Sequence, residues 1–191
     1  MLQIKKLYSE PEIFEPITFE DGFNLIVGEK TEGNVKTNGV GKSLVIEFIN
    51  YALLKRHNDS RVSLIPKEDL SRDTAICLDF ELNGHLITSK RIIKDHDCPE
   101  LTIDGERITY SRLSDANDHL SALLFADAEC QNPPSFRMMM GPLMRDEGSE
   151  FKSIISCFDT NKRIPPEYTP HLFLLHVEPH PYREAKRLYA E

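Results

Sequence analysis

A glycine-rich stretch that ends in a lysine and a hydroxyl, residues 38–43 (Asn-Gly-Val-Gly-Lys-Ser), carries the most specific chemistry in the sequence. Glycines let backbone N–H groups approach phosphate oxygens without a Cβ in the way. Lys42 can reach β- and γ-phosphates as a mobile point charge, and the Ser43 hydroxyl can hold Mg²⁺. The pattern therefore predicts a phosphate cradle with a magnesium ligand at Ser43.

The stretch departs from the usual GxxxxGK[ST] spacing, because Lys36 stands where the first glycine is expected. Gly28 is the natural first glycine, so residues 29–37 are interpreted as an insertion that loops out of the cradle. Added loop length costs little free energy, so the cradle can tolerate it. An alternative stays open, in which Lys30 or Lys36 folds back onto the nucleotide. The expected phosphate-binding residues are Gly28, Asn38, Gly39, Val40, Gly41, Lys42 and Ser43.

A phosphate cradle needs a strand before it and a helix after it. Phe23–Val27 is apolar apart from Asn24 and predicts a buried strand. An edge strand is predicted near Ile13–Phe19, and Asp21-Gly22 predicts a hairpin turn between the two strands. Leu44–Leu54 is nearly all apolar with a narrow polar stripe, which predicts a helix buried on most sides.

Two hairpins are predicted after the helix. Ala75–Leu82 alternates in polarity, Asn83-Gly84 forms the turn, and 86–93 returns; a shorter hairpin follows over 101–109 around Asp104-Gly105. Helices are predicted over residues 112–125, 135–144 and 151–158. The fold class is therefore α/β, with a mixed sheet, an antiparallel β layer and C-terminal helices.

The sequence around the cradle resembles a known family. Residues 19–28 (Phe-Glu-Asp-Gly-Phe-Asn-Leu-Ile-Val-Gly), residues 38–43 and the apolar helix ending Ala-Leu-Leu54 resemble the N-terminal head of SMC/RecN-type ABC ATPases. The insert is similar to that of SMC-like proteins of bacterial three-component ABC systems associated with phage defence. The specific match covers about residues 15–55. It implies a P-loop NTPase head lobe over 1–158, then a connector and the start of a coiled-coil arm over 159–191.

The resemblance also implies ligands and further site residues. ATP and Mg²⁺ are the expected cofactors. Tyr8 and Ser9 are expected in a turn near the nucleotide base, as candidates for base or ribose contact. Gln131 is a candidate for the Q-loop glutamine, which touches Mg²⁺ and the attacking water in ABC ATPases.

Two motifs of an ABC ATPase do not occur in the sequence: an apolar run ending in Asp-Glu, and a Ser-Gly-Gly signature. In the family both lie after a long coiled coil, and the charged helical end at Glu191 fits a chain that continues into one. We expect ATP hydrolysis when a missing C-lobe or partner subunit completes the site in a head-to-head dimer, with DNA as a possible partner of the full assembly. Two alternatives stay open: a complete small P-loop kinase or GTPase, and a non-hydrolysing nucleotide-sensing subunit.

Composition sets the remaining expectations. The net charge of −8 over 191 residues gives no basic excess of the kind that marks a DNA-binding surface. Lys55-Arg56 and Lys90-Arg91 are interpreted as solvated ends of elements. The four cysteines form no C-x-x-C pair, which favours free thiols in a reducing compartment. No run has the length of a membrane span and no signal-peptide core is present, so a cytoplasmic location without membrane contact is expected.

Overall fold

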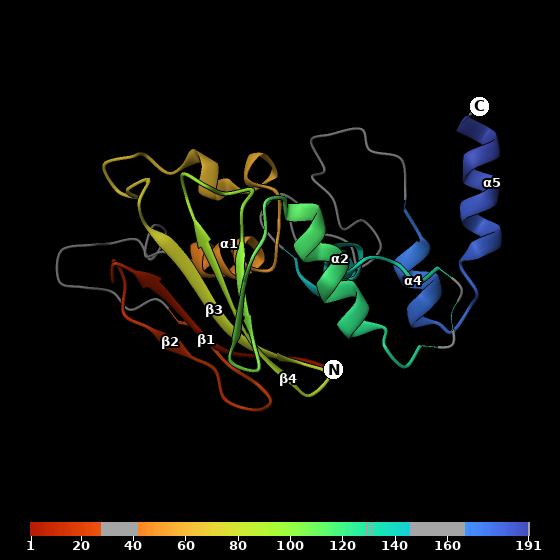
Figure 1. The fold of residues 1–191 in the computed structure, drawn as a ribbon, viewed down its shortest axis with the longest axis horizontal. Coiled ribbons are helices and arrows are strands. Elements are labelled where there is room, and N and C mark those ends of the chain that lie inside the picture. The colour runs from red at the N-terminus through yellow and green to blue at the C-terminus, as the bar shows by residue number, and fades with distance from the viewer. Residues whose placement is uncertain (28–41, 129, 131, 146–166, 191) are drawn as a thin grey trace. The chain divides into compact units, whose positions relative to one another are not determined.

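The computed structural model describes residues 1–27, 42–128, 130, 132–145 and 167–190 (Figure 1). These residues have an α/β fold and divide into two compact units, 1–116 and 117–191. The predicted boundary at residue 158 and the predicted helix over 151–158 lie outside the described residues.

The first unit contains a six-stranded sheet with the order β2-β1-β3-β4-β5-β6. Every pairing in it is antiparallel, whereas a mixed sheet was expected. The strands are β1 (Leu2–Glu10), β2 (Ile17–Thr18), β3 (Ala75–Leu82), β4 (His85–Ile92), β5 (Glu100–Ile103) and β6 (Glu106–Thr109).

The two predicted hairpins are confirmed, with boundaries within one residue of those expected. Asn83 and Gly84 have φ angles of 49° and 86°, and Asp104 and Gly105 have φ angles of 50° and 90°. Two successive positive φ angles define the two-residue turn whose twist matches antiparallel strands, and Asn-Gly and Asp-Gly adopt it most easily. Local turn chemistry therefore sets the register of β3 on β4 and of β5 on β6.

Helix α1 (Lys42–Ala52) packs against β3 and β4, as Figure 1 shows. Its apolar residues from Phe48 onward are buried against the inward face of the sheet, where Leu7, Leu78 and Phe80 are also buried. The predicted burial of this helix is confirmed and extends to the polar stripe, because Glu47 and Asn50 are each only 2% exposed.

The N-terminal region differs from the prediction in three places. β1 runs through to Glu10, so Tyr8 and Ser9 belong to a strand and not to a turn. β2 has only two residues, within the predicted range 13–19. Asp21-Gly22 is a bend, and the described residues that follow it, 23–27, form no strand to complete a hairpin.

The predicted buried strand over Phe23–Val27 is wrong for the described structure. The segment forms no strand, and Phe23, Leu25 and Val27 are 89%, 72% and 67% exposed. A strand that is apolar on both faces needs neighbouring strands and cover on both sides. The residues that the structure describes supply neither, so the segment is exposed.

Short 3₁₀ helices η1 (His57–Asp59) and η2 (Arg61–Leu64) follow α1. The second unit contains most of α2 (Leu113–Leu124), and α3 (Phe136–Leu143), α4 (Thr169–Leu174) and α5 (His180–Ala190). Ser135 caps α3 by accepting from the Met138 N–H at 3.2 Å, and Met139 and Met140 are buried. Over the described ranges, no helix has the length and apolar character to span a membrane.

Candidate phosphate-binding site

The structure places two of the predicted phosphate-binding residues. Lys42 is the first residue of α1, and Ser43 follows it in the first turn with its side chain exposed. The first turn of α1 contains no acidic side chain, so none within that turn competes with an anion for the positive end of the helix dipole. The other predicted loop residues (Gly28, Asn38, Gly39, Val40 and Gly41), the alternatives Lys30 and Lys36, and Gln131 lie outside the described residues.

Tyr8 and Ser9 lie on opposite faces of the sheet. Ser9 pairs across the sheet with Ile76 and, through it, with Arg91, on the face that carries α1. It is buried, and its Oγ accepts a hydrogen bond from the Ile13 N–H at 2.9 Å. Tyr8 points to the other face, where burial and the Asp79 carboxylate raise the pKa of its phenol. The structure thus brings Ser9, but not Tyr8, to the side of the sheet that carries α1.

The C-terminal end of α1 is fixed to β4 by Arg91, whose side chain is fully buried. Its Nη1 donates to the carbonyls of Tyr51 and, at 2.7 Å, of Lys55, and its Nη2 donates to the carbonyl of His96. Nearby, Ser89 Oγ donates to the Ala52 carbonyl at 2.7 Å. The last carbonyls of a helix have no partner within the helix. Ser89 satisfies the Ala52 carbonyl, and the Tyr51 carbonyl, which accepts from the Leu54 N–H at 3.0 Å, receives Arg91 as a second donor.

Burial lowers the pKa of Arg91 to about 10, and its neighbours Tyr51 and Asp97 oppose that shift. The guanidinium therefore stays protonated at neutral pH. A cation at the C-terminal end of a helix interacts favourably with the dipole. Arg91 thus serves as both a hydrogen-bond cap and a charge cap for the helix that begins with Lys42.

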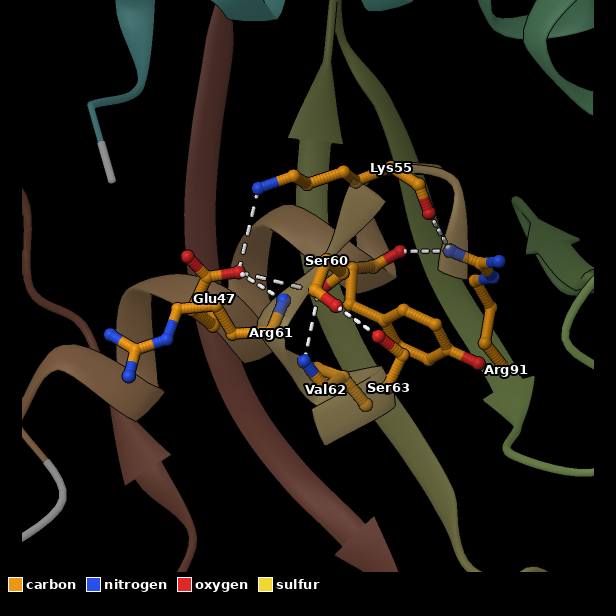
Figure 2. A network of polar contacts seen from close by, with 8 residues as sticks. Glu47, Lys55, Ser60, Arg61, Val62, Ser63 and Arg91 are labelled. Carbon is orange, nitrogen blue, oxygen red and sulfur yellow. Dashed lines mark hydrogen bonds and ion pairs between the residues drawn. The ribbon is translucent and has the colours of Figure 1, made fainter. Parts of the chain in front are cut away.

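A second anchor lies on α1 itself, at Glu47. Its Oε2 accepts from the Ser60 hydroxyl and from the Arg61 backbone N–H, each at 3.3 Å, and lies 3.5 Å from Lys55 Nζ. Figure 2 shows that Lys55 connects the two anchors, because its ammonium points to Glu47 and its carbonyl to Arg91. The chain that leaves α1 is therefore held at both a side chain and a backbone carbonyl.

A cavity of about 350 Å³ lies beside the first turns of α1. Leu44 and Val45, which directly follow Ser43, line it together with Phe48. Phe14, from the connection between β1 and β2, stacks on Phe48 with ring centroids 5.4 Å apart. Most of the lining is apolar, which is typical of sites that take a flat or apolar part of a ligand.

Sequence reasoning missed Arg91 and Glu47 as determinants of the site. Lys90-Arg91 was interpreted as a solvated cluster, which is wrong for Arg91. The alternation of side chains along β4 could have predicted its burial. Residues two and four positions apart lie on the same face of a strand, and Arg91 shares a face with the buried Ile87 and Ser89.

No protein-family model matches this chain. The chain is 36% identical over 87 residues to an uncharacterised protein, YydD, of Bacillus subtilis strain 168. The match covers 44% of this chain and 14% of the relative, so the chain spans only a small part of that protein's length.

Proposed function

We propose that the chain binds Mg-ATP through residues 28–43, with Lys42 on the β- and γ-phosphates and Ser43 on Mg²⁺. The observation that carries this proposal is the position of Lys42 and Ser43 in the first turn of a buried helix. A helix N-terminus combines unpaired N–H groups with a favourable dipole for anions. Arg91 and Glu47 hold the far half of the same helix, so the first turn belongs to a rigid element.

The apolar cavity favours a nucleotide over a simple polyphosphate. It begins at Leu44 and Val45, immediately after the proposed phosphate ligands. Its volume of about 350 Å³ falls in the range of small-molecule sites, which start at roughly 300 Å³. We infer that the base or ribose occupies this cavity while Lys42 and Ser43 hold the phosphates.

We further propose that the chain is the N-terminal lobe of an SMC-like ATPase and hydrolyses ATP only with a second lobe. Hydrolysis requires a group that positions the attacking water, and no apolar run ending in Asp-Glu occurs in the sequence. The exposed Phe23–Val27 segment supports the proposal, because it is a strand-forming sequence without partner strands among the described residues. A partner lobe that supplies those strands would complete the sheet beside the phosphate cradle.

An ATPase assay of the 191-residue chain tests this incompleteness. We expect turnover at or near background, and activity on addition of a lobe with Asp-Glu and signature motifs, lost again in Lys42→Ala. Turnover that requires Lys42 but no partner would overturn the proposal and favour a complete small P-loop enzyme. Binding without turnover under every condition would instead favour a nucleotide-sensing subunit.

The wider role follows from the resemblance alone. We propose that the completed ATPase acts as a head-to-head dimer in DNA sensing, DNA maintenance or defence against phage. The 191-residue chain has a net charge of −8, which makes direct DNA binding by this chain unfavourable. The DNA contact is therefore assigned to the assembled protein. Stimulation of the completed ATPase by linear duplex DNA would support this role, and indifference to DNA would contradict it.

A further inference from the structure

Two histidine rings stack face to face next to the end of α1. His57 begins η1, and His96 lies in the connection between β4 and β5. Their ring centroids are 4.4 Å apart, and the planes differ by 7°. The contact joins the segment that leaves α1 to a segment almost forty residues later in the chain.

Side chains from α1, from β4 and from the β4–β5 connection surround the stack. Tyr51 of α1 presents its ring to His57 edge-on, with centroids 6.1 Å apart. Arg91 of β4 lies over the same tyrosine ring and donates to the His96 carbonyl. Asp97 places Oδ1 3.2 Å from His96 Nδ1, without the geometry of a hydrogen bond. Among the described residues, the charged side chains that act on His57 are the Arg91 guanidinium and the Asp97 carboxylate.

The two rings differ in their polar surroundings. His96 has the Asp97 carboxylate beside it. A proton on His57 is opposed by the neighbouring His96 and Arg91, and His57 Nδ1 has no hydrogen-bond partner among the described residues. Protonation of both rings would place two positive charges in van der Waals contact, next to the positive guanidinium of Arg91.

We propose that the His57–His96 stack is a proton-sensitive clamp, which holds η1 against the β4–β5 connection at neutral pH and opens when both rings are protonated. The opening separates His57 from His96 and frees the segment between α1 and η1. Because Arg91 donates to both the Tyr51 and His96 carbonyls, the clamp is coupled to the cap of α1. The proposal does not depend on what α1 binds.

The direction of the pH effect follows from His57. Burial is the main cause that lowers the pKa of His57 from its ordinary value of 6.5, followed by His96 and Arg91, while Asp97 opposes them. The unfolded chain therefore binds a proton at a higher pH than the folded chain does. The contribution of His57 to the free energy of unfolding is therefore complete above about pH 6.5. It is lost as the pH falls from there through the lower pKa that His57 has in the folded state.

Urea unfolding at several pH values between 5.0 and 7.5 tests the clamp. Asp104, with an ordinary pKa of 3.8 that the hydrogen bond from His85 lowers further, titrates below this window. We expect the midpoint of wild-type unfolding to fall with pH, and His57→Gln and His96→Gln each to remove at least half of that fall. His176→Asn is the matched control, because His176 is exposed and has a φ of 56°, which asparagine tolerates. An equal pH dependence in wild type and both stack variants would overturn the proposal.

NMR can follow the histidine ring signals of the wild-type protein as the pH is changed. This measurement tests the clamp even if a variant does not fold. We expect His57 to titrate below 6.5, together with a change in the signals of residues 55–60 and 93–98. Titration of His57 at or above 6.5, or titration without any change in those segments, would contradict the clamp.

Discussion

Arg91 contacts Tyr51 in two ways at once: its guanidinium carbon lies 3.9 Å from the ring centroid, and its Nη1 donates to the Tyr51 carbonyl. A guanidinium is planar, so one face can rest on an aromatic ring while the edge N–H groups reach carbonyl oxygens. The last turn of α1 is thereby tied to β4 by one side chain. The helix proposed to hold the nucleotide is thus positioned from its far end.

Arg91→Lys is expected to destabilise the protein by about 3 kcal/mol, because lysine retains the charge but cannot donate to three separate carbonyls from one plane. Urea denaturation gives the free energy of unfolding. Arg107→Lys is the matched control, since Arg107 is exposed on β6 and pairs with Glu100 at the surface. A loss at Arg91 within about 0.5 kcal/mol of that control would mean that the cap does not stabilise α1.

Filling the cavity is expected to weaken the binding of a nucleotide more than the binding of a polyphosphate without base or ribose. Val45→Phe adds a ring to the lining of the cavity beside Ser43, so we expect at least a tenfold loss of affinity for Mg-ATP. Affinity for inorganic triphosphate, which has no base or ribose, should change less than threefold. Equal losses for both ligands would place the base outside the cavity.

Two cysteines should react with alkylating reagents at very different rates. Cys98 is exposed, whereas Cys77 is fully buried and burial raises the pKa of its thiol to about 12. At pH 8 the thiolate fraction of such a group is on the order of 10⁻⁴. Peptide mass spectrometry after brief alkylation should find Cys98 modified and Cys77 modified only in urea. Comparable rates in the native protein would contradict the burial of Cys77.

The hairpins and α1 could be predicted from the sequence because their signals are local. Asn83-Gly84 and Asp104-Gly105 specify the turns by their own backbone preferences, and the apolar run after Ser43 specifies a buried helix. Phe23–Val27 shows the limit of such reasoning. Its composition predicts a strand, but a strand requires partners, and a local pattern does not indicate whether they are present.

The anchors of α1 could not be predicted by residue type alone. Arginine is rarely buried, and Arg91 becomes inaccessible because three carbonyls and the Tyr51 ring replace its water shell. Glu47 can be buried because the Ser60 hydroxyl and the Arg61 N–H, which follow the helix in the chain, donate hydrogen bonds to its carboxylate. Both environments depend on contacts that form only in the folded chain.

Calorimetric titration of the chain with Mg-ATP, repeated in EDTA and in Lys42→Ala, Ser43→Ala and Lys67→Ala, tests whether Lys42 and Ser43 bind the nucleotide. Lys67 is the matched control because it is an exposed lysine outside α1. We predict binding by wild type and Lys67→Ala, loss of binding in Lys42→Ala, and a Ser43→Ala affinity that no longer depends on Mg²⁺. At a hundred times Kd, binding should stabilise the chain by ~2.7 kcal/mol. No binding by the wild type, or unchanged binding in Lys42→Ala, would contradict nucleotide binding at the start of α1.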